Sequence, residues 1–312
     1  MGKVEFDAAK EIPDLSSKVI LITGGTAGLG YETAVSFAAH NPDRILFTGR
    51  SQSSADKLIE DVNSRFPNVA IDFVKCDLAS LETVRSAAKE VLAKTKRLDL
   101  VFANAGVMAL PPGLTKDGFE IQFGTNHMGN AHMVNLLTPL MESTAKRNGD
   151  VRVIWNTSQG YMFHPKGGIL FDKVKTTQED IAPVLASWGR YGQSKLANIL
   201  YARAFAKHYP SITSVVIHPG ISATGLVTNL NLASKLFVYA TTMGNRLPPE
   251  QCAWNQQWAA TAPLGTGDRQ VESGGYYEPV GAKAKLQGES GSDELAERLW
   301  NWTHEELKGY KL

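Results

Sequence analysis

Tyr191 and Lys195 occupy the first and last positions of the stretch Tyr-Gly-Gln-Ser-Lys, a spacing that places both side chains on one face of a helix. Tyrosine and lysine can both exchange protons with a reacting group, so the pair is a candidate for acid–base chemistry. The same spacing also arises by chance in a chain of this composition. Its interpretation therefore depends on the segments around it.

A glycine-rich loop, Thr-Gly-Gly-Thr-Ala-Gly-Leu-Gly at 23–30, follows the first apolar run and opens into a helical pattern. Gly24 permits a tight turn, Gly28 lets the backbone approach a pyrophosphate, and Gly30 allows helix and strand to pack closely. The helix N-terminus would face the anion. This arrangement predicts a dinucleotide site, although a glycine-rich turn before a helix is the simpler alternative.

Arg50 and its serine neighbours follow the second apolar run, Leu-Phe-Thr-Gly at 46–49. Dinucleotide sites that select NAD usually place an acidic residue here for the ribose 2′-hydroxyl. The sequence offers a cation and hydroxyl donors instead, which suit a 2′-phosphate. It therefore predicts NADP(H) as cofactor, and a solvated arginine is the alternative.

Short apolar runs alternate with amphipathic helical patterns along the first two thirds of the chain. This alternation predicts a parallel sheet with right-handed crossovers, and apolar runs without strict alternation predict strands buried on both faces. We expect a single α/β Rossmann-type domain over 1–312, with a doubly wound parallel seven-stranded sheet and helices on both faces. The expected strands are 18–23, 44–48, 69–74, 98–103, 151–155, 212–217 and 275–278, and the expected helices are 29–40, 55–66, 81–93, 119–141 and 188–208.

Two segments, 159–187 and 221–249, interrupt the alternation and are expected to be inserts on the substrate side. Within the second, the spacing of Leu226, Leu230, Ala233 and Phe237 predicts a helix. We interpret this helix as a mobile apolar lid, with a packing helix or a membrane-surface helix as alternatives.

Composition excludes several classes of protein. A formal charge of +1 gives no strong positive electrostatic potential that would attract nucleic acid. An apolar fraction of 43% excludes an intrinsically disordered chain. Cys76 and Cys252 cannot form a disulfide framework and suit a reducing compartment. No sequence pattern of a protein-built metal site, signal peptide or transmembrane helix is found, so we expect a cytoplasmic protein without metal.

The chain resembles the short-chain dehydrogenase/reductase family over nearly its whole length. The matching motifs, in order, are TGGTAGLG (23–30), CDL (76–78), NAG (104–106), Asn126 in TNHMG, Ser158 in NTSQG, YGQSK (191–195) and PGISAT (219–224). NHMGN (126–130) and SKLANIL (194–200) are most similar to the retinol-dehydrogenase-like members.

The resemblance implies a catalytic role for four residues. Tyr191 would be the general acid that protonates a carbonyl oxygen, and Lys195 would lower its pKa and bind the nicotinamide ribose. Ser158 would donate to the substrate oxygen. Asn126 would help to hold a water that relays protons from Lys195. Thr157 is a neighbouring hydroxyl and the alternative to Ser158.

The resemblance also implies the cofactor contacts. Asp77 would accept from the adenine amino group, and Ile221 would lie close to the nicotinamide carboxamide. Residues 104–106 would line the adenine ribose side, and Pro219, Gly220 and Thr224 would lie against the nicotinamide and its phosphate. The full predicted set is Gly24, Thr26, Ala27, Gly28, Leu29, Gly30, Arg50, Asp77, Leu78, Asn104, Ala105, Gly106, Tyr191, Lys195, Pro219, Gly220, Ile221 and Thr224.

The histidines are interpreted more plainly. His127 and His132 have a poor spacing for a metal and are expected to be core or surface residues. His218 is expected to end a strand. His164 is a weaker candidate for contact with a substrate. Cys76 is expected to be buried and unreactive. The 119–141 and 188–208 helices are the usual association surfaces of the family, so a homodimer or homotetramer is expected.

The sequence therefore predicts an NADP(H)-dependent oxidoreductase that interconverts a carbonyl and an alcohol on a moderately sized apolar small molecule. One alternative is an NADP(H)-binding sensor or scaffold without turnover. Another is an epimerase or dehydratase that uses the same Tyr/Lys pair.

Overall fold

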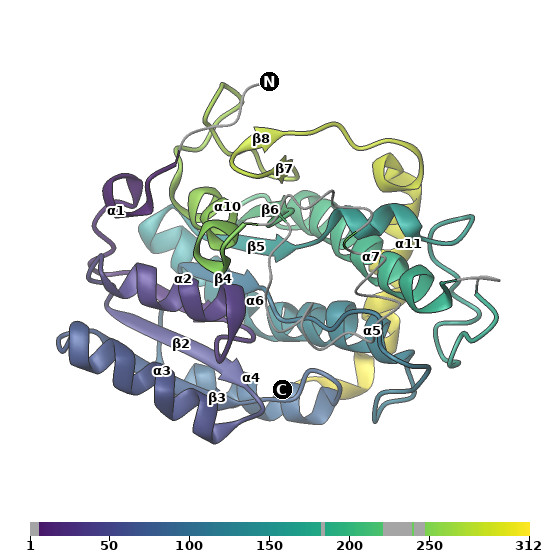
Figure 1. Ribbon diagram of the computed structural model, residues 1–312, viewed down its shortest axis with the longest axis horizontal. Helices are drawn as coiled ribbons and strands as arrows, with labels where there is room; N and C mark the ends of the chain where they lie inside the picture. The colour runs from purple at the N-terminus through teal and green to yellow at the C-terminus, as the bar shows by residue number, and fades with distance from the viewer. Residues whose placement is uncertain (1–5, 182–184, 221–238, 240–246) are drawn as a thin grey trace.

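The strands of the computed structural model form one sheet of eight strands in the order β3-β2-β1-β4-β5-β6-β7-β8 (Figure 1). The structure describes residues 6–181, 185–220, 239 and 247–312. All neighbouring strands are parallel except β7 and β8. The strands are β1 (Val19–Ile22), β2 (Arg44–Gly49), β3 (Ala70–Lys75), β4 (Leu100–Ala103), β5 (Arg152–Asn156), β6 (Thr213–Ile217), β7 (Tyr276–Glu278) and β8 (Ala282–Lys283).

The doubly wound parallel sheet is confirmed, with a correction to its strand count. The expected seven strands are present, and β8 adds a short antiparallel strand at the edge. Its pairing joins Tyr277 to Lys283 and Glu278 to Ala282. A two-residue strand has too few positions to show any periodicity, so the sequence carried no signal for it.

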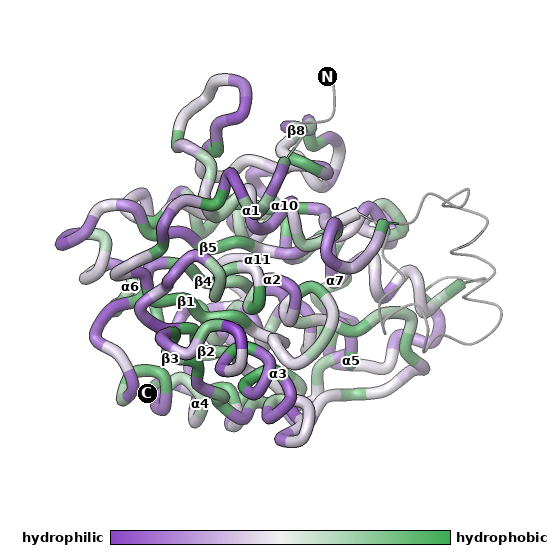
Figure 2. Tube along the Cα trace, turned by 60° about the vertical axis from the view of Figure 1, so that its left-hand side comes forward, coloured by the Kyte–Doolittle hydropathy of each residue, from purple (hydrophilic) through white to green (hydrophobic). Residues whose placement is uncertain are grey.

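Two hydrophobic cores lie on opposite faces of the sheet, and successive residues of β1 divide between them. Val19 and Leu21 enter one core, while Ile20 and Ile22 enter the other. In Figure 2 much of the apolar colour lies along β1, β4 and β5 in the centre of the molecule. Strands that are covered on both faces need apolar side chains at every position, which is why they read as continuous apolar runs.

Helices on each face bury these cores. One core includes α4 (Leu81–Lys94), α6 (Gly129–Asn148) and α7 (Ala186–His208), and the other includes α2 (Gly28–Ala38), α3 (Gln52–Arg65) and α10 (Pro249–Thr261). Among the described residues, the remaining helical segments are α1 (Ala8–Glu11), α5 (Ile121–Phe123), a π-helical turn (Gly124–Met128), α11 (Asp293–Glu306) and 3₁₀ turns at Gln159–Phe163, Gly288–Gly291 and Lys308–Tyr310.

The C-terminal helix α11 packs against α7, which the sequence predicted as an association surface. Trp300 of α11 stacks on Tyr201 of α7 with ring centroids 4.9 Å apart. Most of α7 between Trp188 and Phe205 is buried within the single chain. A homodimer or homotetramer stays a prediction, and any such contact would have to use surfaces that α11 leaves exposed. In the described ranges no helix has the length and apolar character needed to span a membrane.

Candidate active site

The predicted site residues gather where the parallel strands end. The strand order changes direction between β1 and β4, and in such sheets a crevice for ligands forms outside the carboxyl ends of the strands at this point. The glycine loop follows β1, residues 104–106 follow β4, and Ser158 follows β5. The topology therefore brings together segments that lie more than a hundred residues apart in the sequence.

The glycine loop has the tight geometry that its composition predicts. Gly24 and Gly28 have positive φ angles of 69° and 56°, which residues other than glycine rarely adopt. A Cβ atom on Gly30 would lie 2.4 Å from the Gly24 carbonyl oxygen and 2.8 Å from Asn104 Nδ2. Gly30 is therefore required for the close approach of α2 to this loop.

The start of α2 can accept an anion from outside the chain. Ala27 is the N-cap residue and makes no side-chain capping bond to the first amides of the helix. Those amides need hydrogen-bond acceptors, and the helix dipole favours a negative one. Ala27 is exposed, and Thr26 and Leu29 are half-buried, so this part of the loop is accessible. These features fit a pyrophosphate.

Asn104 fastens the loop after β4 to the glycine loop. Its side-chain Nδ2 donates to the Thr23 carbonyl over 2.9 Å, and its backbone amide donates to Thr23 Oγ1 over 3.0 Å. The Ala105 amide also donates to Thr23 Oγ1, over 3.0 Å. Because these bonds use the Asn104 side chain within the protein, its predicted place beside the adenine ribose would have to come from its backbone.

The residues expected near the adenine end differ in exposure. Arg50 is exposed directly after β2, and Ser51 Oγ caps α3 by accepting from the Ser54 amide over 3.2 Å. Asp77 is half-buried and accepts from the Ala79 amide over 3.1 Å. Leu78 is 6% exposed and belongs to the hydrophobic core. Arg50 and Asp77 remain open to a ligand, whereas Leu78 contributes mainly to packing.

Tyr191 and Ser158 lie close together beyond the end of β5. Ser158 Oγ accepts from the Gly160 amide over 3.1 Å, and both Ser158 Oγ and the Tyr191 ring lie close to Gly160. Burial raises the pKa of Tyr191 to about 12, while the Ser158 side chain acts in the opposite direction. A Cβ atom on Gly160 would lie 2.9 Å from Tyr191 Cε1, so glycine is needed for this contact.

Lys195 lies one turn along α7 from Tyr191, as the spacing predicts. Its Nζ atom is 5.8 Å from the centre of the Tyr191 ring and donates to the Asn156 carbonyl oxygen over 3.2 Å. Burial lowers the pKa of Lys195 to about 8. A Cβ atom on Gly106 would lie 3.2 Å from Nζ, so the bare glycine backbone leaves room for the amine.

Asn126 occupies the π-helical turn between α5 and α6. Its Nδ2 donates to the Val107 carbonyl and to Ser194 Oγ, each over 2.9 Å, and its Oδ1 accepts from the Val107 amide over 2.7 Å. π-Helical turns within α-helices are frequent at functional sites. The side chain joins the loop after β4 to α7, so the role that this geometry supports is positioning, and the predicted water relay stays a prediction.

Thr157 has a different task from its neighbour Ser158. Its Oγ1 donates to the Lys195 backbone carbonyl over 2.8 Å, and the side chain is buried. Thr157 therefore holds α7, while Ser158 lies beside Tyr191. This difference supports Ser158 over Thr157 as the hydroxyl that would face a substrate.

Sequence reasoning missed Asn156 and Gln256, whose side-chain amides form hydrogen bonds to the segments that carry the site. Asn156 Nδ2 donates to Asn104 Oδ1 over 2.9 Å and to Gln256 Oε1 over 2.7 Å. The backbone carbonyl oxygen of Asn156 accepts a hydrogen bond from Lys195 Nζ. Gln256 in turn donates to Thr33 Oγ1 of α2. The amide chain thus connects the glycine-loop helix, the loop after β4 and the lysine. A polar residue at the end of an apolar strand was the one available signal.

Several predictions fall on residues that the structure does not describe. Ile221, Thr224 and the expected lid with Leu226, Leu230, Ala233 and Phe237 lie outside the described ranges, as does most of the 221–249 insert. Pro219 and Gly220 do lie at the end of β6, where Gly220 has a φ angle of 89°. The 159–187 insert is described apart from 182–184 and begins with the 3₁₀ turn.

His127, His132 and Cys76 are buried, and the contact of His164 with a substrate stays a prediction. Burial lowers the pKa values of His127 and His132 to about 3 and about 4. His164 is half-buried, contacts the Pro165 carbonyl over 2.8 Å and lies 3.9 Å from Glu289. Burial raises the pKa of the Cys76 thiol to about 12, so it stays protonated. Within the part of the chain that the structure describes, no cluster of ligating side chains could hold a metal ion.

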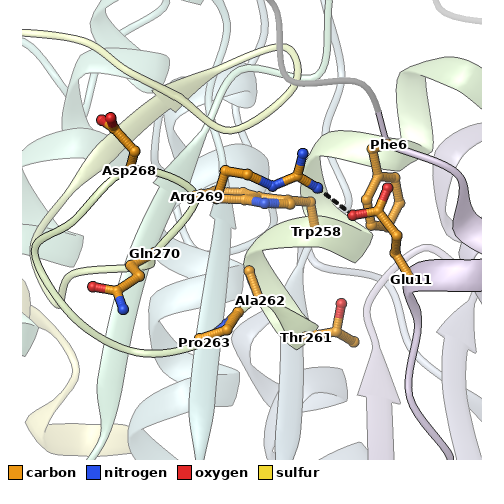
Figure 3. A pocket seen from close by; sticks show the side chains of 9 residues that line it. All are labelled: Phe6, Glu11, Trp258, Thr261, Ala262, Pro263, Asp268, Arg269 and Gln270. Atoms are coloured by element: carbon orange, nitrogen blue, oxygen red, sulfur yellow. Dashed lines mark hydrogen bonds and ion pairs between the residues drawn. The ribbon is translucent and has the colours of Figure 1, made fainter.

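A separate pocket of about 270 Å³ lies beside the C-terminal end of α10 (Figure 3). Arg269 and Glu11 form an ion pair there, drawn as a dashed line. None of the predicted catalytic or cofactor residues lines it. The lining residues are Phe6, Glu11, Trp258, Thr261, Ala262, Pro263, Asp268, Arg269 and Gln270.

Comparison with known proteins agrees with this geometry. The family model for short chain dehydrogenases matches residues 18–163. The short-chain dehydrogenase/reductase drtF of Aspergillus calidoustus is 34% identical over 96% of this chain and 97% of its own length. An uncharacterised oxidoreductase of Schizosaccharomyces pombe is 33% identical over 96% of this chain and 88% of its own.

Solved structures share the fold at lower identity. The crystal structure of 3-ketoacyl-(acyl-carrier-protein) reductase from Brucella melitensis, complexed with NADH, has a TM-score of 0.64 and 20% identity. The similarity covers 86% of this chain and 98% of the Brucella chain. At this identity it supports the fold and leaves the activity to the site itself.

Proposed function

This chain belongs to the short-chain dehydrogenase/reductase family of oxidoreductases, and on that premise we propose that it interconverts a carbonyl and an alcohol with NADP(H). The observation that supports the proposal most directly is the juxtaposition of three side chains. A Cβ atom on Gly160 would lie 2.9 Å from Tyr191 Cε1 and 3.4 Å from Ser158 Oγ, so these two side chains face the same position, and Lys195 Nζ lies 5.8 Å from the tyrosine ring centre.

Tyr191 would act as the proton donor during reduction. With a pKa of about 12, its hydroxyl stays protonated at neutral pH and can give its proton to a carbonyl oxygen that becomes an alkoxide. Ser158, beside it, would hydrogen-bond the same oxygen and fix its position. In the reverse direction the tyrosinate is needed, and the nearby Lys195 cation favours that form.

A dinucleotide fits the chain on the evidence of the cradle around the glycine loop. The loop excludes Cβ atoms at Gly24 and Gly30, where they would approach neighbouring atoms to 2.8 Å and 2.4 Å, and the N-cap side chain of α2 makes no hydrogen bond to the first amides of the helix. When bound, a nicotinamide supplies the hydride. The first turn of α2 would hold its pyrophosphate, and Lys195 its ribose hydroxyls.

The choice of NADP(H) rests on Arg50. Since the similar Brucella reductase was solved with NADH, the fold alone does not decide between the two cofactors. The exposed Arg50 is free to meet a 2′-phosphate, and the residues after it up to Ala55 carry no acid that would select a ribose hydroxyl.

The surroundings of Tyr191 favour an apolar substrate. Trp188 lies edge-on to the Tyr191 ring at 6.0 Å, and Phe163 lies 6.2 Å from Trp188. Met162 is 62% exposed beside them. Apolar walls with a few polar groups at the reacting atom are typical of small-molecule sites.

The test combines NADPH oxidation with dinucleotide binding. Tyr191→Phe should abolish turnover of a panel of aromatic ketones, long-chain aldehydes, steroids and quinones while NADPH binding survives. Tyr201→Phe is the matched control, because Tyr201 is also a buried tyrosine of α7 and loses a hydrogen bond to Asn135 of 2.7 Å. Binding without turnover by the unaltered protein would favour the sensor, and turnover that survives in Tyr191→Phe would refute the assignment.

A further inference from the structure

An ion pair is buried directly behind the candidate catalytic residues. Arg190 Nε lies 3.3 Å from Glu120 Oε1, and the two side chains are 2% and 0% exposed. The two atoms do not meet in hydrogen-bond geometry, so their contact is a charge pairing. Buried charges are costly to desolvate, and such a pair often adds little stability compared with apolar residues of similar size. Its place in the fold therefore needs another explanation.

Glu120 controls the start of the segment that carries Asn126. As N-cap of α5, it accepts hydrogen bonds at Oε2 from the amides of Gln122 and Phe123, over 3.0 Å and 2.7 Å. The π-helical turn with Asn126 follows without interruption. The position of the Glu120 carboxylate thus sets where this helical segment begins.

Arg190 directly precedes Tyr191 and connects three further segments. Its Nη2 donates to the Leu110 carbonyl over 2.9 Å, in the loop that begins with residues 104–106. Its Nη1 donates to the Gln178 carbonyl over 3.3 Å, in the insert before α7. One guanidinium therefore contacts the β4 loop, the insert and the Asn126 segment, and it belongs to the helix of Tyr191.

We propose that the Arg190–Glu120 pair is a positioning device that fixes the N-terminal part of α7, and hence Tyr191, relative to the Asn126 turn and the β4 loop. The inference rests on the proposed function. A planar guanidinium with donors in fixed directions suits this task, because each contact constrains a different segment. Displacement of about 1 Å at a reacting group can cost about 100-fold in rate.

The test removes the charges together. In Arg190→Met/Glu120→Gln no buried charge is left unpaired, and the glutamine oxygen can still accept from the α5 amides. We expect kcat to fall about 10- to 100-fold, with KM for the dinucleotide changed less than about twofold. Because the chemical step becomes slower, the isotope effect with NADPH deuterated at both C4 positions should rise.

A matched control lies at the opposite end of β5. Arg152, 4% exposed in its side chain, pairs with Asp150 and donates to the Ala259 and Ala262 carbonyls. Arg152→Met/Asp150→Asn should lower thermal stability without changing kcat or the isotope effect. Equal kcat and isotope effects in the two double variants would overturn the proposal.

Two further measurements keep the proposal falsifiable. If the first double variant does not fold, Arg190→Lys replaces it, since lysine keeps the charge but cannot span the same contacts; an unchanged kcat would then count against the device. If the unaltered protein turns over no carbonyl, the proposed function fails, and hydrogen exchange decides the device separately. Loss of amide protection in residues 104–128 of the double variant, compared with the unaltered protein, would support the positioning role of the Arg190–Glu120 pair. Unchanged protection would overturn it.

Discussion

Replacing Lys195 by methionine tests how the lysine acts on Tyr191. The substitution removes the charge and keeps much of the side-chain length. The separation of 5.8 Å between Nζ and the ring centre gives the scale of the interaction. At an effective dielectric constant of about 20, two unit charges at this distance interact by about 3 kcal/mol, equivalent to about two pKa units.

Alcohol oxidation needs the tyrosinate, whose population falls as its pKa rises. At pH 7, below the Lys195 pKa of about 8, the wild-type lysine is charged, so Lys195→Met should reduce the tyrosinate population and the oxidation rate about 100-fold.

The defect should also shrink at high pH. Above pH 8 the wild-type lysine loses its own proton, and by about pH 10 both proteins lack the charge near Tyr191. The oxidation rates should then differ only a few-fold. The assay is the pH dependence of kcat for alcohol oxidation, followed by NADPH formation at saturating cofactor. Lys207→Met, at the exposed end of the same helix, is the control.

A constant defect across pH 6 to 10 would refute this reasoning. It would mean that Lys195 contributes by hydrogen bonding to the cofactor and to Asn156, with no electrostatic influence on the tyrosine.

Two other predictions concern cofactor choice and acid stability. Arg50→Ala should lower the preference of kcat/KM for NADPH over NADH about tenfold, whereas Arg65→Ala on α3 should leave it unchanged; an unaltered preference in Arg50→Ala would contradict the 2′-phosphate role. Burial lowers the pKa of His127, His132 and His218 to about 3 to 4, so each binds a proton only on unfolding. The stabilisation from these neutral histidines is complete above the unfolded pKa of about 6.5 and is lost towards pH 4. In that range the free energy of unfolding, measured with urea, should fall with a slope approaching about 4 kcal/mol per pH unit. A free energy of unfolding that does not change with pH would contradict this prediction.

The central sheet was predictable because its strands follow a simple physical rule. A strand covered on both faces is apolar at every position, and β1 illustrates this with Ile20 and Leu21 in opposite cores. A comparable apolar pattern is missing from helix α10, because its buried positions include the polar residues Asn255 and Gln256. These amides satisfy backbone groups and other amides, so the helix shows no apolar stripe, and the sequence did not predict it.

The site was predictable in its residue types and less so in its connections. Lys195 and Ser158 both lie near Tyr191, as their motifs indicate. The pairing of Arg190 with Glu120 joins residues that lie far apart in the chain, and no local pattern records it. The same holds for the bonds that occupy the Asn126 side chain. Long-range polar contacts depend on how helices cross, which local periodicity does not determine.

Helix α7 shows why those polar contacts matter for the proposed chemistry. It is buried on nearly all sides between the sheet, α11 and the insert, yet many of its buried side chains are polar. Lys195 and Asn198 donate to one carbonyl, that of Asn156, over 3.2 Å and 3.0 Å. Gln193 accepts from the Leu170 amide of the insert over 2.9 Å. Apolar packing alone tolerates small shifts along a helix axis, whereas each of these bonds has a direction and a length. The polar side chains therefore fix the register of α7, and with it the distance between Tyr191 and the groups it would serve.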